Sequence, residues 1–156
     1  MSFDTAGRVL TPLQPAFLLR NSSSITNVTG DGTAYTVVWG SETYDIGSNC
    51  ASGVFTAPVA GKYHFECFMM LTQLSTSMTV VVADFVCSSA ENRRFQYRKL
   101  EDTQSEAGTY YHVGGSCMTD LSASETVSVR VTVSGGSKTV DIDYVWNTMF
   151  AGRLMG

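Results

Sequence analysis

The chain has 156 residues, of which 44% are hydrophobic and only 15% are charged. This length suits one domain with one core. Because soluble proteins carry roughly 25% charged residues, we expect other chains, either copies of this one or a scaffold, to cover part of the surface. The net charge of −4 argues against a nucleic-acid binder, whose affinity would depend on Lys and Arg neutralising phosphates.

No segment of the sequence has the form of a targeting or membrane-spanning signal. Apolar runs stay well short of the roughly 20 residues that a membrane helix needs. The first residues lack the basic start, apolar stretch and small-residue cleavage site of a secretion signal. The sequence therefore predicts synthesis in the cytoplasm and no membrane insertion.

Residues 1–14 differ from the rest of the chain in showing little apolar periodicity. They contain Gly7 and Pro12, which interrupt regular structure. We expect an N-terminal docking arm over residues 1–14, followed by one domain over residues 15–156.

Beyond the arm, apolar runs of strand length recur between clusters of Gly, Ser, Thr, Asn and Asp. This pattern is typical of an all-β sandwich or barrel, and no segment has helical periodicity. The expected strands are residues 15–20, 34–39, 53–55, 62–71, 77–87, 94–100, 109–118, 125–133 and 139–154.

Two of these strands differ in how their faces are patterned. In 125–133, valines at every second position alternate with Ser128, Arg130 and Thr132, which predicts one buried and one solvated face. Strand 77–87 is apolar at almost every position, which predicts a strand covered on one face by its own sandwich and on the other by another subunit. We expect a subunit interface near this strand.

Residues 55–65 combine a rigid turn with the start of a strand. Pro58 fixes φ and withholds a backbone donor, while Gly61 permits a positive φ, so the two residues favour a turn. After the turn, Tyr63 and Phe65 alternate with polar residues and are expected to point inward.

The four cysteines lack the close spacing of zinc ribbons or redox motifs. They are Cys50, Cys67, Cys87 and Cys117. In a protein made in the cytoplasm, buried free thiols are the favoured state. A disulfide stays open as the alternative.

No motif places a catalytic nucleophile beside either of the two histidines, His64 and His112. A glycosidase would need two carboxylates facing each other across a cleft. Glu101 and Asp102 fit this poorly, because adjacent strand residues point in opposite directions. We therefore predict no enzyme, no catalytic residue and no bound cofactor.

Asp141 and Asp143 are the one carboxylate pair expected on a single strand face. They could hold a calcium ion if backbone oxygens completed its shell. The solvent face of a half-buried strand explains them more simply, so calcium is kept only as an alternative.

Positive charge is concentrated around the predicted strand 94–100. Four of the chain's 10 Lys and Arg lie there, namely Arg93, Arg94, Arg98 and Lys99. One hypothesis is contact with an acidic capsid or host surface. The alternative is an ordinary edge strand that charge protects from aggregation.

Three motifs carry a resemblance to a known family of domains. They are Pro15-Ala-Phe17 at the first strand, Phe55-Thr-Ala-Pro58-Val-Ala-Gly61-Lys-Tyr63-His-Phe65 in the middle, and Phe150-Ala-Gly152-Arg-Leu154 near the end. Over about residues 15–156, the chain resembles the globular head of the complement q subcomponent, which is related in fold to tumour necrosis factor.

More narrowly, the chain looks like the version of this domain found in structural proteins of tailed bacteriophages, often at fibre ends. The segments that carry this likeness are Thr29-Gly-Asp-Gly-Thr33, Tyr44-Asp-Ile-Gly47, Phe55-Thr-Ala-Pro58-Val-Ala-Gly61 and the arm sequence Gly7-Arg-Val-Leu-Thr-Pro12-Leu-Gln-Pro-Ala-Phe17.

The resemblance implies a ten-stranded jelly-roll β-sandwich that assembles as a tight homotrimer about a threefold axis. Gly152 is expected to leave room for a neighbour's backbone or ring. The residues implied for the trimer interface or core are Phe17, Tyr63, Phe65, Val81, Phe85, Phe150, Gly152 and Leu154.

The function that the resemblance implies is a non-enzymatic capsid decoration, or cement, protein on the phage head, with the major capsid protein as partner. The head is favoured because a fibre tip usually follows a shaft, and only about 14 residues precede the first strand. The docking candidates are Arg8, Leu10, Arg94 and Arg98.

The alternative is a receptor-binding knob at the tip of a tail fibre or head fibre. Its ligand would be a glycan or protein of the host surface. Exposed aromatic residues such as Tyr110, Tyr111 or Trp39 could then stack on sugars.

Overall fold

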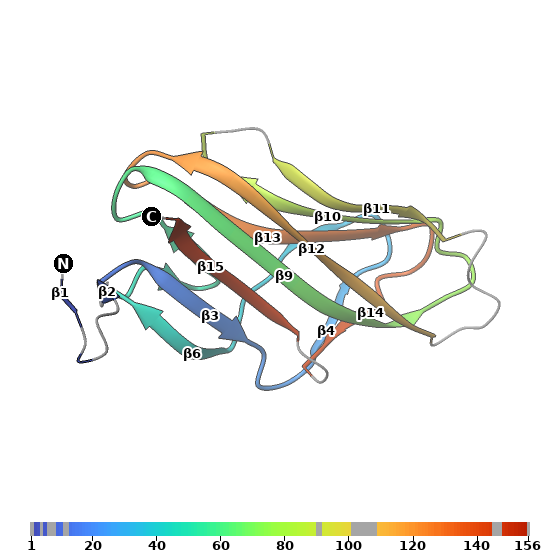
Figure 1. Ribbon diagram of the computed structural model, residues 1–156. Helices are drawn as coiled ribbons and strands as arrows, with labels where there is room; N and C mark the ends of the chain where they lie inside the picture. Colours follow the sequence, from blue (N-terminus) through green and yellow to red (C-terminus); the bar gives the residue numbers. More distant parts are fainter. Residues whose placement is uncertain are drawn as a thin grey trace.

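The computed structural model describes residues 2, 3, 5, 9, 10, 13–89, 92–100, 109–144 and 148–155. These residues form two antiparallel β-sheets that pack face to face, with a small two-stranded sheet near the N-terminus (Figure 1). The described part of the chain contains no helix that could span a membrane. The all-β sandwich predicted from the sequence is confirmed.

The six-stranded sheet is built around β13 (Thr126–Ser134). On one side lie β10 (Val80–Cys87) and then the edge strand β11 (Arg93–Lys99). On the other side β13 pairs with β8 (Val54–Thr56), which pairs with β7 (Cys50–Ala51), while β5 (Ala34–Thr36) pairs with a further stretch of β13.

The seven-stranded sheet is built around the long strand β9 (Gly61–Leu74). One edge of β9 pairs with β12 (Thr109–Leu121) along its length. The other edge is shared, because β15 (Met149–Met155) pairs with the first half and β14 (Val140–Asp143) with the second.

Three further strands complete the seven-stranded sheet. β3 (Ala16–Arg20) pairs with β15, and β6 (Ser41–Ile46) pairs with β3 and forms an edge. β4 (Ile25–Thr29) pairs with β14. Of the segment expected to be an arm, β1 (Ser2–Phe3) and β2 (Val9–Leu10) pair with each other.

The prediction of one continuous strand over 139–154 is wrong. Asp143 is the partner of Met70 and Met149 is the partner of Phe68, so the chain makes six steps while β9 makes two. β14 and β15 are therefore separate strands, and Thr148 Oγ1 accepts a hydrogen bond from the Met70 amide at 3.3 Å. The alternation of apolar residues continues on both sides, and for this reason the interruption was not visible in the sequence.

The core between the sheets is formed by the inward faces of these strands. The valines at every second position of β13, from Val127 to Val133, are all fully buried, as predicted. Aromatic rings fill the centre: Phe17 stacks on Phe55 at 5.0 Å between ring centroids and meets Phe150 edge-on at 4.9 Å. Each ring buried in this way contributes roughly 1.5–3 kcal/mol.

All eight residues predicted for the trimer interface or core are buried within a single chain or packed against its core. The expectation for Gly152 needs correction. A Cβ there would lie 2.6 Å from ring atoms of both Phe17 and Phe65. Gly152 therefore makes room for rings of its own chain rather than for a neighbour.

Candidate interaction surfaces

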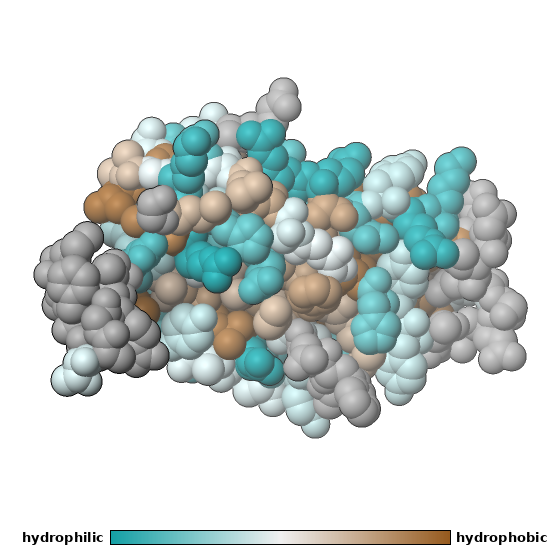
Figure 2. All heavy atoms as spheres, in the orientation of Figure 1, coloured by the Kyte–Doolittle hydropathy of each residue, from teal (hydrophilic) through white to brown (hydrophobic). Residues whose placement is uncertain are grey.

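The outward face of the seven-stranded sheet carries large apolar side chains that are exposed. We call this surface the apolar face; it is formed by the outward residues of β3, β6, β9, β12 and β15. Phe68 is 49% exposed, Met118 66% and Tyr110 65%. Figure 2 views the molecule from this side and shows apolar side chains between scattered hydrophilic ones.

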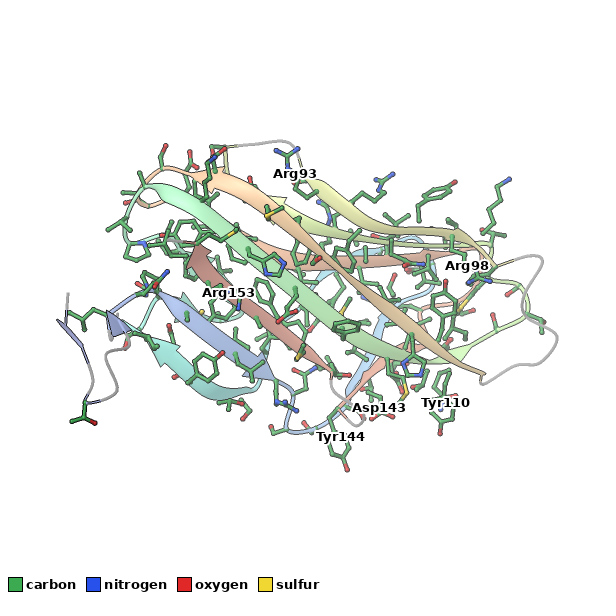
Figure 3. The ribbon with its side chains drawn as sticks, viewed as in Figure 1. Arg93, Arg98, Tyr110, Asp143, Tyr144 and Arg153 are labelled. Atoms are coloured by element: carbon green, nitrogen blue, oxygen red, sulfur yellow. The ribbon has the colours of Figure 1, made fainter. Side chains whose placement is uncertain are left out.

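The strand registers show which outward side chains are neighbours on this face. One row across the sheet runs from Met118 through His64 to Arg153, and the next from Ser116 through Glu66 to Ala151. The Arg153 side chain projects outward from β15 on this face (Figure 3). Four of the six residues in these two rows are polar, and the row that follows holds Gly114, Phe68 and Met149, so the apolar side chains of this face lie among polar ones.

A pair of glycines in β12 shapes both sides of the sheet. A Cβ on Gly114 would lie 2.5 Å from the Phe68 ring, so the ring lies flat over this glycine on the apolar face. A Cβ on Gly115 would lie 2.7 Å from Phe95 Cβ on the inner side. This Gly-Gly pair was not among the residues predicted for a site, although two adjacent glycines in a strand are a signal of close approaches on its two faces.

A small hollow of about 80 Å³ opens on the apolar face beside Gly152. Its lining includes Tyr44, His64, Glu66 and Arg153. A second hollow, of about 180 Å³, lies between β6, the edge strand of the seven-stranded sheet, and β7, the edge strand of the six-stranded sheet. Its lining includes Trp39, Glu42 and Cys50. Trp39 is therefore largely buried rather than an exposed platform for sugars.

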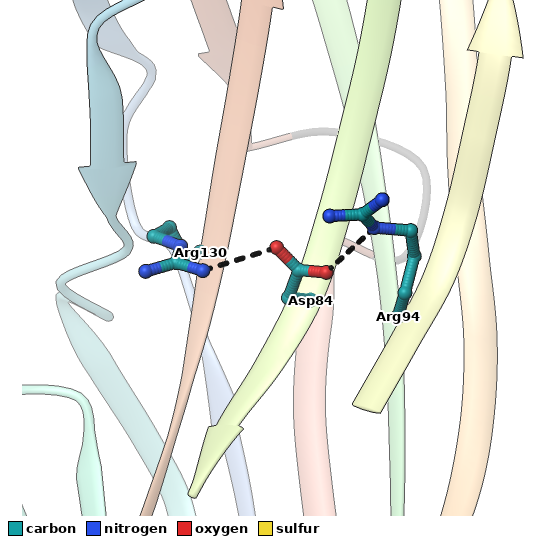
Figure 4. Close-up of polar contacts among 3 residues, drawn as sticks. All are labelled: Asp84, Arg94 and Arg130. Carbon is teal, nitrogen blue, oxygen red and sulfur yellow. Dashed lines mark hydrogen bonds and ion pairs between the residues drawn. The ribbon is translucent and has the colours of Figure 1, made fainter. Parts of the chain in front are cut away.

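The outward face of the six-stranded sheet has a different chemistry. We call it the charged face. The carboxylate of Asp84 lies between two arginines, accepting from Arg94 Nε at 3.0 Å and from Arg130 Nη2 at 3.2 Å (Figure 4). The two side chains cover Asp84, which is only 4% exposed.

This arrangement corrects the expectation for strand 77–87. Its inward residues, Val81, Ala83 and Phe85, are fully buried in the chain's own core. On its other face, Asp84 with its two arginines occupies the middle of the strand. That face is therefore not the continuous apolar surface that the sequence suggested for a subunit contact.

The cations of β11 are partly engaged within the chain. Arg94 also lies over the Tyr97 ring, at 5.9 Å from its centroid, and Arg98 lies over the Tyr111 ring at 6.0 Å. Arg93 and Arg98 lie at opposite ends of the strand (Figure 3). Among the docking candidates, Arg94 and Arg98 are thus exposed on this strand, Arg8 lies outside the described residues, and only the backbone of Leu10 is described.

The carboxylates considered for calcium have partners in the chain. Asp141 accepts a hydrogen bond from the Asn27 amide at 2.7 Å, and the Ser24 hydroxyl donates to Asp143 at 3.3 Å. Within the described ranges, no group of three or more His, Cys, Asp or Glu side chains is placed to hold a metal ion. Glu101 and Asp102 lie outside those ranges, and calcium stays a prediction.

All four cysteines are thiols in this structure. Burial raises the pKa of Cys67, which is fully enclosed, and also the pKa of Cys50 and Cys87. Burial likewise raises the pKa of Cys117, to about 11. At neutral pH the thiols are therefore protonated and act as small core residues.

No family model matches the sequence, and no curated protein matches it either. Solved structures do match. The globular domain of zebrafish complement 1qA protein is 18% identical, with a TM-score of 0.60 over 92% of this chain and 98% of that one. The Eiger TNF structure from S. frugiperda is 11% identical, with a TM-score of 0.62 over 92% of this chain and 94% of that one.

Murine APRIL is a third structure of this kind, 10% identical with a TM-score of 0.56 over 92% of this chain and 99% of that one. The chain therefore has the jelly-roll fold of complement q heads and tumour necrosis factor. At these identities, the likeness concerns the fold.

Proposed function

We propose that this chain forms a homotrimer through its apolar face and serves as a non-enzymatic decoration protein on the head of a tailed bacteriophage. The observation that carries the first part is the apolar face itself. Phe68 and Met118 are about half or more exposed on adjacent strands of one sheet. Exposed apolar side chains of this size on one sheet face indicate an interaction site in a chain with few charges.

Self-association fits this surface better than a transient partner does. The centre of a stable interface is rich in aromatic residues and methionine, and Phe68 and Met118 are side chains of these kinds, although the row of Ser116 and Glu66 lies between them. The resemblance to complement q heads sets the expected number of subunits at three. We thus assign the contact to the apolar face instead of β10.

Binding rather than catalysis is the proposed role because both distinctive surfaces suit contacts between proteins. The charged face and β11 would stay outside a trimer built on the apolar face. Arg98 and Tyr97 are exposed there and could meet acidic side chains of a capsid protein. Binding only to the assembled shell would stabilise that shell by linkage.

The assignment to a phage head rests on the sequence resemblance and is tested on particles. Quantitative mass spectrometry of purified virions should find hundreds of copies of the chain per particle. A handful of copies would instead support the alternative, a receptor-binding knob at a fibre tip, for which the exposed Tyr110 is the most available sugar-stacking residue.

The arm makes a separate prediction. Deleting residues 1–14 should leave a folded trimer that no longer attaches to shells, because Arg8 and Leu10 are proposed to dock. Cosedimentation of the truncated protein with undecorated shells measures this. Full occupancy by the truncated trimer would rule the arm out and leave the trimer proposal intact.

A further inference from the structure

Two of the four thiols lie on strands that approach each other across one edge of the sandwich. In the six-stranded sheet, Cys87 is the partner of Val127, and Val127 is the partner of Phe55. In the seven-stranded sheet, Cys117 is the partner of Phe65. The rings of Phe55 and Phe65 meet across the sandwich at 5.5 Å, so these two rows face each other.

The sheets come closest at the edge formed by β11 and β12. A Cβ on Gly115 would lie only 2.7 Å from Phe95 Cβ, and Phe95 packs on Phe85 at 4.5 Å between ring centroids. The two backbones are therefore separated here by much less than the roughly 10 Å usual between packed sheets. This close approach joins β11 to β12, and Cys87 lies on β10, the next strand in from β11.

The thiols belong to the next layer of inward side chains. Cys117 follows Gly115 by two residues and Cys87 follows Phe85 by two, so each points inward like its neighbour. Gln96 donates to the Tyr111 hydroxyl at 3.2 Å, while Phe95 meets Gly115, so β11 and β12 run antiparallel. β10 is also antiparallel to β11. The step from Gly115 to Cys117 and the step from Phe85 to Cys87 therefore lead in the same direction.

The electrostatics of the two groups agree with their proximity. Besides burial, the Cys87 sulfur raises the pKa of Cys117. The guanidinium of Arg93 acts on both thiols in the opposite sense, lowering the pKa of each. One cation thus lies within reach of both sulfurs and favours their thiolate forms.

We propose that Cys87 and Cys117 are a redox-active thiol pair that closes to a disulfide between the two sheets when a low-molecular-weight disulfide such as glutathione disulfide is present. This inference does not depend on the proposed function. Inside a cell rich in thiols the pair would stay reduced, and in surroundings that lack thiols the disulfide could form.

The chemistry proceeds in two exchanges. Cys117, the more exposed of the pair, loses its proton and its thiolate attacks one sulfur of glutathione disulfide, which releases one glutathione thiolate and leaves a mixed disulfide. The Cys87 thiolate then attacks Cys117 Sγ and releases the second glutathione. The protein loses two protons and two electrons, and glutathione disulfide is reduced to two glutathione molecules.

The other two cysteines provide internal controls. Cys50 lies on β7, separated from Cys87 by two strands in the same row, and Cys67 is enclosed in the centre of β9. Cys50 is therefore remote from the pair, whereas Cys67, the partner of Gly115, is a diagonal neighbour of Cys117 and is fully buried. Cys50→Ser should therefore leave closure unchanged.

The experiment treats the folded full-length chain with glutathione disulfide, blocks remaining thiols with an alkylating reagent and maps the peptides by mass spectrometry. The expected product is one intramolecular disulfide, Cys87 to Cys117, in both wild type and Cys50→Ser. Cys87→Ser should stop at glutathione attached to Cys117. The rate should rise about tenfold per pH unit below the pKa of the attacking thiol.

A second measurement does not depend on the variants folding. Oxidised wild type should unfold at a temperature roughly 5–10 °C above that of the reduced protein, because the cross-link restricts the unfolded chain. Reductant should reverse the shift. Four alkylated thiols after oxidation of the wild type, or a disulfide that includes Cys50 or Cys67 in the folded protein, would overturn the proposal.

Discussion

The two outward faces of this sandwich enclose the same core but differ in the chemistry of their exposed side chains. On the charged face, Asp84 is covered by Arg94 and Arg130, so the centre of that surface is internally satisfied. On the apolar face, Phe68 is 49% and Met118 66% exposed. This difference between the two faces is the reason for proposing the apolar face as the side that self-associates.

The largest effect is expected from placing a charge at the centre of the apolar face. Phe68→Asp should abolish the trimer, raising its dissociation constant on the order of 100-fold or more, because the carboxylate would be buried without a partner. Sedimentation velocity measures this. The matched control is Tyr97→Asp on the charged face, where the replaced ring is 59% exposed against 49% for Phe68. Equal loss of assembly in both variants would refute the distinction between the faces.

Two glycines separate packing in the core from packing on the apolar face. Gly152→Ala should lower the free energy of unfolding by about 1–3 kcal/mol, since its Cβ would overlap two buried rings. Gly114→Ala meets only the half-exposed Phe68 ring, which can turn aside. It should change unfolding by less than about 1 kcal/mol but weaken association.

Chemical denaturation at a matched subunit concentration measures the first effect, because trimer stability depends on concentration. If Gly114→Ala destabilises the fold as strongly as Gly152→Ala and leaves association unchanged, Phe68 is a core residue of the single chain instead.

The charged face should respond in stability and not in assembly. Asp84→Ala removes two charge-assisted hydrogen bonds, but both guanidinium groups are partly exposed and can rehydrate. The expected loss in the free energy of unfolding is about 1–2 kcal/mol. Asp84→Asn, which keeps the shape and one acceptor, should lose less. A change of oligomeric state in either variant would contradict the assignment of this face.

The smallest effect is expected at the end of β11. Arg98→Glu should change the free energy of unfolding by less than about 0.5 kcal/mol and leave the trimer intact, because the side chain is exposed and lies over the Tyr111 ring. Thermal unfolding and sedimentation check this. A destabilisation comparable to that of Asp84→Ala would mean that Arg98 has a structural role.

The sequence predicted the inward side of the molecule well. Alternation in 62–71 and 125–133 identified Phe65 and the valines of β13 as core residues, because period-two patterning reports directly on which side chains point inward. The edge strand β6 was missed, since within Ser41–Ile46 only Tyr44 and Ile46 are apolar, and two residues do not make a clear alternation. β4 was missed as well, where Asn27 adopts a positive φ within the strand.

The outward faces were harder to predict, because their character depends on residues far apart in the chain. Strand 77–87 appeared apolar on both faces, and Asp84 was a single exception. Its partners Arg94 and Arg130 are brought to it by strand pairing, 10 and 46 residues along the chain. Likewise, Phe68 and Met118 become one surface only when β9 and β12 are aligned, although Phe68 was already on the outward side of its predicted strand.

The central claim is that the apolar face holds three copies of the chain together. Sedimentation equilibrium at micromolar concentration tests it most directly. We predict a single species of three times the 16.9 kDa chain mass, converted to monomer by Phe68→Asp and not by Tyr97→Asp. A stable wild-type monomer at that concentration would contradict the account.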